Sequence, residues 1–424
     1  MRYAIVGAGP AGVVAAETLR QHDPGGEITL IGDEHSAPYS RMAIPYYLSG
    51  GIPEAGTHLR KERGHFEGLR IRYVQDEATA VDSSQRAVAL KKSGKVPYDR
   101  LLIASGSRPV RPPIPGLEGP GIHPCWTLED AREIHALARP GSRAVLIGGG
   151  FIGSIILNAL FHRNVKLTVV EMENRMVPRM MNEAAGKLIQ QWCEAQGVEV
   201  RTSASVASVG KGKERRYSLA VNRGGAIEAD LVIVATGVRP RTDFLAGSGV
   251  ALGKGQGVAV NEFLQSSVPE IYAAGDVAEG TDFSTGLKNL HPIQPTAVEH
   301  GRVAALNMAG QPTGYQGSLN MNVLETVGLV SHSFGLWGGV SGGEHCERLE
   351  PANHRYVQLQ FQGDRMIGAI AVGEVDNVGL LRGMIQSKLR LGSWKQSLLA
   401  DPGRFAQAYL GLNRMSRTPA LQAG

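Results

Sequence analysis

Two glycine motifs hold the residues of this sequence that could do chemistry. The first is Gly7-Ala8-Gly9-Pro10-Ala11-Gly12, and the second is Gly148-Gly149-Gly150-Phe151-Ile152-Gly153. In such a motif the first glycine makes a tight turn, the second lets the backbone approach a pyrophosphate, and the third lets a helix pack closely on a strand. The phosphates then lie at the helix N-terminus. Two such motifs predict a chain that binds two dinucleotides and moves electrons between them.

Acidic residues follow each motif where a ribose is recognised. Asp33 and Glu34 come after one apolar run, and Glu171 ends the corresponding run in the second half. A carboxylate at the end of the second strand can accept hydrogen bonds from both ribose hydroxyls. Glu171 also favours NAD over NADP, because a carboxylate repels a 2′-phosphate. No arginine follows it directly, although Arg175 and Arg179 lie further along.

The elements that must position these residues form two strand–helix–strand units. The apolar patterns predict strands at 3–6, 28–31, 144–147 and 167–170, with helical segments at 13–20 and 155–161. A chain with 55 glycines matches a bare glycine pattern by chance, but strand, helix and terminal acid in register are far more specific. The predicted fold class is α/β, with two Rossmann-like dinucleotide-binding domains and a C-terminal α+β interface domain.

The rest of the chain supplies a loose internal repeat and a third module. A buried strand runs into Ala104-Ser105-Gly106, and a near-copy runs into Ala235-Thr236-Gly237. We expect a turn-rich loop at 33–63, a proline-rich crossover at 109–115, and helices at 128–138 and 296–308. Further strands are expected at 71–74, 87–90, 356–361 and 366–372, and a third region that begins at 271–277 precedes the last of these strands and a terminal helical segment. The expected domains are 1–113 with 241–318 for FAD, 114–240 for NAD, 319–412 for the α+β module, and a tail at 413–424.

Bulk properties narrow the class of protein. The formal net charge is +5, and seven Lys and Arg residues stand between Asn377 and Gly424 against the single acid Asp401. This asymmetry suits either an acidic partner or a solvated surface, and no nucleic-acid motif accompanies it. The three cysteines, Cys125, Cys193 and Cys346, are too dispersed for a metal or disulfide motif. With no leader or membrane-length apolar run, we expect a cytoplasmic protein.

These motifs together resemble the FAD-dependent pyridine nucleotide–disulfide oxidoreductases over nearly the whole chain, to about Leu412. The resemblance implies that the first motif holds the FAD pyrophosphate and that Gly275 and Asp276 of Ala274-Gly275-Asp276 hold the ribityl chain. It implies that the helix beginning near Thr296 directs its N-terminus at the flavin. The other implied contacts with FAD are Pro10, Ala11, Arg41, Ala78, Ser105, Gly106, Arg108 and Pro295. Those with NAD(H) are Gly148, Gly150, Phe151, Ile152, Gly153, Glu171 and Gly237.

Departures from the family pattern indicate the branch. Disulfide and peroxide reductases of this family carry a cysteine where this chain has Met42, and a thioether cannot form a thiolate. The chain is therefore similar to the cysteine-free branch of ferredoxin and rubredoxin reductases and nitrite-reductase flavin modules. It is also similar to the FAD subunit of tungsten-dependent aldehyde oxidoreductase complexes. Relatives usually place a glutamate where this chain has Ile155, which puts the placement of the nicotinamide in question.

The resulting hypothesis is an electron-transfer flavoenzyme with no catalytic side chain and no metal. FAD would exchange a hydride with NAD(H) and single electrons with an iron–sulfur partner protein or complex subunit. One alternative is a peripheral membrane NADH:quinone oxidoreductase, with Val378, Leu381, Ile385 and Leu389 on one face of an interfacial helix. The alternative for this helix is that its apolar face packs in the core of the protein, with the basic residues beside it in solvent. A third hypothesis is a non-catalytic, NAD-responsive flavoprotein. Oligomeric state is left open.

Overall fold

The computed structural model describes residues 1–373 and 376–417, and these form two compact units. The first unit contains Met1–Val110, Trp126–Ala131 and Val238–Ser318. The second contains Arg111–Cys125, Arg132–Gly237 and the described chain from Leu319 onward. The glycine motif at residues 7–12 lies in the first unit and the motif at 148–153 lies in the second. Each dinucleotide motif thus has a folded unit of its own.

A five-stranded parallel sheet forms the centre of the first unit. Its strand order is β19-β7-β1-β2-β3. The strands are β1 (Arg2–Val6), β2 (Glu27–Gly32), β3 (Ile71–Gln75), β7 (Arg100–Ile103) and β19 (Ile271–Ala273). Nearly continuous apolar runs form β1, β7 and β19 because both faces of a parallel sheet are buried. The strands predicted at 3–6, 28–31 and 71–74 are confirmed, and the third region, at 271–277, begins with β19.

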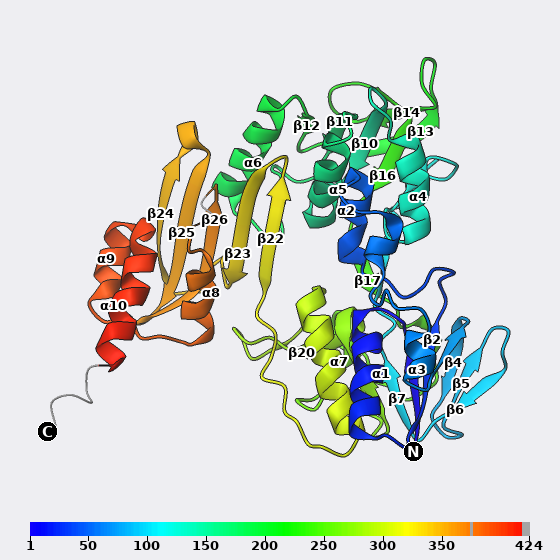
Figure 1. Cartoon of the computed structure of the whole chain (residues 1–424). Helices are drawn as coiled ribbons and strands as arrows, with labels where there is room; N and C mark the ends of the chain where they lie inside the picture. Colours follow the sequence, from blue (N-terminus) through cyan, green and yellow to red (C-terminus); the bar gives the residue numbers. More distant parts are fainter. Residues whose placement is uncertain (374–375, 418–424) are drawn as a thin grey trace, which may run out of the picture. The chain divides into compact units, whose positions relative to one another are not determined.

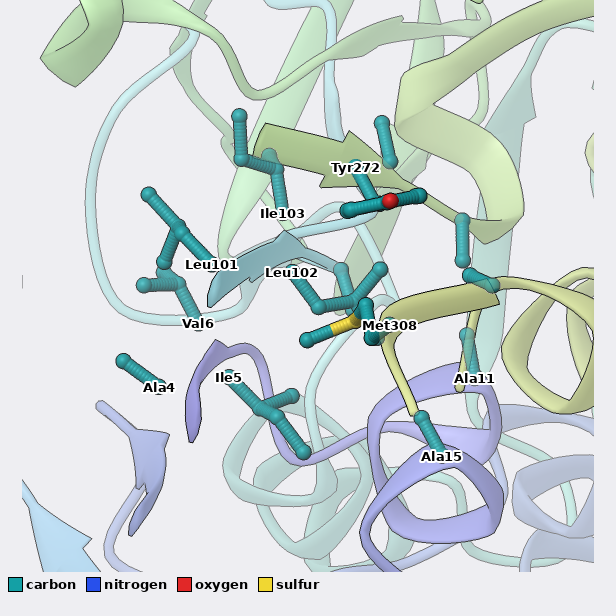
Figure 2. Close-up of a cluster of buried hydrophobic side chains, with 14 of the residues drawn as sticks. Ala4, Ile5, Val6, Ala11, Ala15, Leu101, Leu102, Ile103, Tyr272 and Met308 are labelled. Carbon is teal, nitrogen blue, oxygen red and sulfur yellow. The ribbon is translucent and has the colours of Figure 1, made fainter. Parts of the chain in front are cut away.

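Two helices pack against this sheet and against each other. They are α1 (Pro10–His22) and α7 (Gln294–Met308). A Cβ atom at Gly301 would lie 2.3 Å from the carbonyl oxygen of Ala11, so the two backbones meet where only glycine fits. Figure 2 shows Ala11 and Ala15 of α1 with Met308 of α7 beside side chains of β1, β7 and β19. This core holds the carboxyl end of β1, where the first glycine motif begins.

Shorter elements complete the first unit (Figure 1). The antiparallel strands are β4 (Ala78–Asp82), β5 (Ala87–Leu90), β6 (Lys95–Pro97), β8 (Ser107–Pro109), β17 (Val238–Pro240), β18 (Val258–Ala259), β20 (Ala278–Thr281) and β21 (Lys288–Leu290), with β18 parallel to β20. The segment expected as a loop at 33–63 instead contains helical turns. These are η1 (Arg41–Ala43), α2 (Ile44–Ser49) and η2 (Glu54–Thr57), and α3 (His65–Gly68) follows. Pro45 is compatible with α2 because it lies in the first turn, where its missing N–H costs no hydrogen bond.

The second unit repeats the parallel architecture. Its sheet has the order β12-β11-β10-β16-β9. The strands are β9 (Ile122–His123), β10 (Arg143–Ile147), β11 (Lys166–Val170), β12 (Glu199–Arg201) and β16 (Leu231–Val234). The helices are α5 (Phe151–Phe161) and α6 (Glu183–Ala195), and α4 (Leu128–Leu137) begins in the first unit. An antiparallel sheet is formed by β13 (Val206–Lys211), β14 (Tyr217–Val221) and β15 (Ile227–Ala229). The strand pair predicted around the second motif is confirmed.

The predicted C-terminal α+β module is an antiparallel sheet with helices. The sheet order is β22-β23-β26-β25-β24. Its strands are β22 (Met321–Thr326), β23 (Leu329–Gly335), β24 (Glu344–Glu350), β25 (Arg355–Gln362) and β26 (Arg365–Val372); the helices are α8 (Gly379–Gln386), α9 (Trp394–Ala400) and α10 (Phe405–Arg417). Hydrogen bonds join it to the second parallel sheet's helices, since the Trp192 indole donates to the carbonyl of Val327 at 2.8 Å. The module therefore groups with the second unit.

The helix considered as a membrane-surface element is α8. Its apolar residues Leu381, Met384 and Ile385 are 0–4% exposed, so this face packs in a core and is not free to enter a bilayer. Within residues 1–373 and 376–417, no helix has both the length and the apolar character needed to cross a membrane. Helix α10 continues to Arg417, past the start of the expected tail, and residues 418–424 lie outside the described part of the chain.

Candidate dinucleotide-binding sites

The first and third glycines of both motifs are required by the fold itself. Gly7 has φ +115° and Gly148 has φ +105°, a region that side-chain-bearing residues rarely adopt. A Cβ at Gly12 would lie 1.9 Å from the carbonyl oxygen of Gly7, and one at Gly153 would lie 2.1 Å from that of Gly148. These contacts let α1 and α5 begin directly at the ends of β1 and β10. The two motifs therefore share one local geometry.

The second glycines are not explained by the fold. Gly9 and Gly150 have φ −79° and −77°, which any residue can adopt, and a Cβ at either would meet no protein atom within 4 Å. Each residue is the N-cap of its helix and offers no side-chain acceptor to the N–H groups of the first turn. Open space beside unsatisfied helical N–H groups fits a pyrophosphate. Pro10 and Ala11, and likewise Phe151 and Ile152, form the first turns that face these spaces.

The two predicted glycine turns after β7 and β16 also match each other. Gly106 has φ +68° and Gly237 has φ +109°, and neither would bring a Cβ within 4 Å of another atom. The first turn is fixed by Ser105, whose Oγ donates to the carbonyl of Arg241 at 2.8 Å. Both turns therefore present bare backbone at the carboxyl end of a parallel sheet, where dinucleotides bind in this architecture.

A hollow at the carboxyl ends of β1 and β2 brings together several expected FAD contacts. It contains about 300 Å³ of empty space, part of it open to solvent. Its lining is Val6, Gly7, Ile31, Asp33, Asp76, Ala78, Ser105, Arg241 and Phe244. Asp33, Ala78 and Ser105 were expected from the sequence. Asp76, Arg241 and Phe244 were missed, because each comes from a segment that carries no motif and reaches the hollow only through the tertiary fold.

Arg41 lies in a cluster of aromatic and acidic groups. Its guanidinium pairs with Glu34 at 2.7 Å and donates to the Tyr39 hydroxyl and the Trp126 carbonyl, each at 2.8 Å. Its carbon Cζ also lies 5.1 Å from the centre of the Trp126 ring, within cation–π range. Burial and the neighbouring Glu34 raise the pKa of Tyr39, which keeps it a hydrogen-bond donor. Glu34 and Arg41 are thus paired with each other, and Tyr39 and Trp126 are partners that the sequence did not reveal.

Asp276 is hydrogen-bonded to the residue that follows the first glycine turn. It accepts a hydrogen bond from Ser107 Oγ at 2.8 Å, and burial raises the pKa of its carboxyl group, against the opposing effects of Ser107 and Arg41. Its neighbour Gly275 has φ +78° and donates its N–H to His300 Nδ1 at 3.4 Å. Arg108, on the same strand as Ser107, pairs with Asp243. A carboxylate held in this way can accept hydrogen bonds from the hydroxyls of a polyol chain.

The N-terminus of α7 offers a positive dipole end. The helix begins with Gln294, Pro295 and Thr296, and neither a capping side chain nor an acidic residue in the first turn neutralises it. Thr296 is 5% exposed. A helix terminus of this kind stabilises a negative charge that lies close to its first turn. This helix end could therefore stabilise negative charge on a flavin bound beside it.

Glu171 is built into the second glycine loop. Its carboxylate is 7% exposed and accepts N–H groups from Gly149 at 2.7 Å and Glu173 at 2.8 Å. Each oxygen keeps a further lone pair for a ribose hydroxyl. Arg175 does not offer its guanidinium to a 2′-phosphate, since it donates to Asn174 at 2.8 Å and to the carbonyls of Met181 and Pro178. Ile155, on α5, is half buried and brings no charge to this site.

No thiol of the described chain is positioned or tuned for redox chemistry. Met42, at the position where a redox cysteine is expected, is 50% exposed. Burial raises the pKa of Cys193 to about 12 and that of Cys346 to about 11, so both are protonated at neutral pH. Cys125 is buried. Because the thiolate is the reactive form, neither Cys193 nor Cys346 is set up for disulfide exchange.

Known proteins similar to this chain include two that are named for their use of NADH and one that is named a ferredoxin reductase. The NADH-dependent phenylglyoxylate dehydrogenase subunit epsilon of Aromatoleum evansii is 30% identical, over 95% of both chains. An NADH oxidase of Methanocaldococcus jannaschii is 34% identical, over 79% of this chain and 76% of its own. A probable ferredoxin reductase of Castellaniella defragrans is 31% identical, over 73% of this chain and 76% of its own.

A solved structure and a family model also match this chain. A NAD-dependent persulfide reductase from A. fulgidus superposes with a TM-score of 0.85 at 27% identity, covering 93% of this chain and 78% of its own. The family model described as pyridine nucleotide-disulphide oxidoreductase matches residues 1–301, which include both glycine motifs and Asp276. This family binds FAD and NAD(H), for which the two cradles fit. The chain therefore belongs to the pyridine nucleotide-disulphide oxidoreductase family and is an FAD-dependent NAD(P)H oxidoreductase.

Proposed function

We propose that this protein is an NADH-coupled reductase that passes single electrons to an iron–sulfur protein or to an iron–sulfur subunit of a complex. The observation that carries the proposal is the pair of open cradles at Gly9 and Gly150 in a chain without a tuned thiol. Bound FAD supplies exchange of a hydride on one side and of single electrons on the other. The residues of the chain bind, orient and shield, and none needs to act as a nucleophile.

The first unit would hold FAD along its length. The N–H groups of the α1 first turn would bind the pyrophosphate, and Asp33 would accept from the adenosine ribose. Asp276, oriented by Ser107, would accept from the ribityl hydroxyls. The N-terminus of α7 would face the flavin and stabilise negative charge on it. In the second unit, Glu171 and the first turn of α5 would hold NADH. We assign residues 1–113 with 241–318 to FAD binding, 114–240 to NAD binding and 319–412 to a partner interface.

Two features support an iron–sulfur partner. One relative is named a ferredoxin reductase, and the match that spans 95% of both chains is a subunit of an NADH-dependent dehydrogenase. In the C-terminal module, Arg382, Lys388, Arg390 and Arg404 are exposed, whereas Lys395 is paired with Glu344. A basic surface favours the docking of an acidic electron-transfer protein. We propose that the protein acts in the cytoplasm, as the NADH-oxidising member of a small chain or complex.

The alternatives are less well supported. A thiol-based oxidase would need a thiolate where Met42 stands. A membrane-surface quinone reductase would need an exposed apolar face on α8. The residues of that face, Leu381, Met384 and Ile385, are buried. A non-catalytic flavoprotein would be supported only by Ile155, at the position where the family resemblance implies a glutamate.

Anaerobic stopped-flow spectroscopy tests the proposal directly. The FAD-loaded protein is mixed with NADH or NADPH, and the reduced protein is then mixed with an oxidised ferredoxin, a quinone or oxygen. Rapid flavin bleaching by NADH, followed by reoxidation faster with ferredoxin than with quinone or oxygen, supports the proposal. Faster reoxidation by quinone or oxygen would replace the iron–sulfur partner. Tight NADH binding without bleaching would reject the reductase itself.

A further inference from the structure

Arg241 lines the same hollow as Asp33, although it belongs to no motif. It follows β17, the strand on which the chain returns to the first unit after residue 237. Strand β17 pairs antiparallel with β8, which carries Ser107 and Arg108. Arg241 therefore stands at the junction between a crossover strand and the lining of the hollow.

The backbone of Arg241 is fixed at both of its polar groups. Its N–H donates to the carbonyl of Gly106 at 2.9 Å, and its carbonyl accepts from Ser105 Oγ at 2.8 Å. The residue is thus tied on both sides to the glycine turn after β7. Because the backbone is already ordered, only the side-chain torsions of Arg241 remain to be fixed when its guanidinium takes up a single position.

The guanidinium joins two acids from different segments. It pairs with Asp33 Oδ2, after β2, and with Glu77 Oε1 at 3.1 Å, just before β4. The Arg241, Asp33 and Glu77 side chains are 31%, 36% and 39% exposed, so the bridge is partly open to solvent. Glu77 has a second partner in Lys91 at 3.1 Å, whereas Asp33 is oriented by its ion pair with Arg241.

A third acid explains why a cation is needed at this place. Asp76 is 6% exposed and accepts the N–H groups of Glu77, Lys92 and Ser93. Although burial alone would raise the pKa of Asp76, these hydrogen bonds lower it to about 2, so the carboxyl group is ionised at neutral pH. Asp33 and Asp76 line the hollow, and Glu77 reaches it only through its ion pair with Arg241. These carboxylates would repel one another and the phosphates of a dinucleotide, and Arg241 offsets this charge.

We propose that Arg241 is the positioning residue for the adenosine end of FAD, and that it makes the site select FAD over FMN. By occupying Oδ2 of Asp33, it would leave Oδ1 as the acceptor for the ribose hydroxyls. FMN has no adenosine and gains nothing from this arrangement. This inference rests on the assignment of the first unit to FAD.

Titration of the apoprotein with FAD, FMN and ADP, followed by fluorescence, tests the inference. In Arg241→Gln and Arg241→Ala, the affinities for FAD and ADP should fall roughly 10- to 100-fold, the range for a lost hydrogen bond to a charged group, while FMN affinity stays unchanged. Arg241→Lys keeps the charge without the planar fork, so its affinities for FAD and ADP should lie between those of the wild type and of Arg241→Gln. Arg239→Ala is the matched control, since Arg239 is 58% exposed on the same crossover strand and reaches Asp243 only at 4.0 Å.

A double-mutant cycle provides the second readout. In the Asp33→Asn background, Arg241→Gln should weaken FAD binding far less than in the wild-type protein, because the two residues act through one contact. Equal losses of FAD and FMN affinity, or additive effects in the cycle, would overturn the inference, and so would unchanged FAD affinity in a folded Arg241→Gln protein. A wild-type apoprotein that binds no FAD would instead reject the proposed function, whatever the variants do.

Discussion

Ser107 Oγ donates a hydrogen bond to Asp276 Oδ2 at 2.8 Å, although 169 residues separate them in the chain. Ser107 begins β8 and Asp276 lies in the helical turn η4 (Gly275–Val277), so the bond joins the first glycine turn to the Gly-Asp motif. Burial raises the pKa of the Asp276 carboxyl group, which means that its ionised form is a cost to the fold until hydroxyl donors surround it.

Asp276→Asn should make the apoprotein more stable and FAD binding weaker. Because the folded-state pKa lies above the ordinary value of 3.8, the stability contributed by Asp276 is present in acid and is lost as the pH rises through the folded-state pKa. Asparagine keeps an acceptor for Ser107 and has no such loss. Urea unfolding of both apoproteins between pH 4 and 8 should show a gap that widens with pH, while FAD affinity of the variant falls roughly 10- to 100-fold. A gap that is constant with pH would contradict the argument.

His300 should govern part of the acid sensitivity of the fold. Burial, together with nearby His291, lowers the pKa of His300 to about 3, so its neutral ring accepts the Gly275 N–H and stands edge-on to Tyr315 at 4.6 Å between ring centres. As the pH falls from about 6.5 toward 3, the unfolded chain takes up a proton that the folded chain refuses, and stability is lost.

The variant that checks this is His300→Gln, whose amide oxygen can still accept from Gly275. Its loss of stability over that pH range should be shallower than in the wild type, with FAD binding retained. His22→Gln, on the exposed end of α1, serves as the control and should leave the slope as it is. If His300→Gln loses stability with the same slope as the wild type, the ring is not the group responsible.

The two open glycines should separate the two nucleotides. Gly9→Ala should weaken FAD binding and leave NADH binding to the second unit intact, and Gly150→Ala should do the reverse, because each methyl group enters space that a pyrophosphate would fill. Both variants should fold, since φ near −79° and −77° suits alanine. Gly12→Ala is the contrasting variant and should destabilise the fold by about 2 kcal/mol or more, because its Cβ meets the Gly7 carbonyl oxygen. Calorimetric titration with each nucleotide measures the two affinities, and thermal unfolding measures stability. If either Gly9→Ala or Gly150→Ala weakened the binding of both nucleotides, the assignment would be wrong.

Glu171→Gln should reduce the preference for NADH over NADPH. The substitution removes the charge that opposes a 2′-phosphate while keeping one acceptor for a ribose hydroxyl and a donor for the other. We expect kcat/KM with NADH to fall roughly tenfold and that with NADPH to rise, so that the ratio shifts by about 10- to 100-fold. Glu173→Gln, an exposed neighbour, is the control and should leave the ratio unchanged. An unaltered ratio in Glu171→Gln would mean that selectivity arises elsewhere.

Local backbone chemistry made much of the fold predictable. The positions of Gly7, Gly12, Gly148 and Gly153 follow from turn geometry and close packing within a few residues, and those requirements are written in the motif itself. The helical turns of η1, α2 and η2 were not predicted, because Pro45 and the tyrosines beside it read as a turn when their packing is unknown.

Long-range contacts were beyond the sequence for a different reason. Arg241 reaches Asp33 across 208 residues, and Trp126 stacks near Arg41 across 85. Side chains that meet only after the chain has folded leave no spacing pattern to detect. The motif residues could be assigned to a site from sequence, but the groups that orient them could not.

The strand order of the first unit also has a consequence during protein synthesis. Strand β7 ends at residue 103, whereas its outer neighbour β19 begins only at residue 271. At about 5–20 residues per second, a ribosome needs roughly 10–30 s to make the intervening chain. During that time the edge of β7 has no partner strand and no α7 beside it. The strand carries the apolar side chains Leu101, Leu102 and Ile103. In the nascent chain this edge therefore stays unpaired until β19 and α7 have left the exit tunnel.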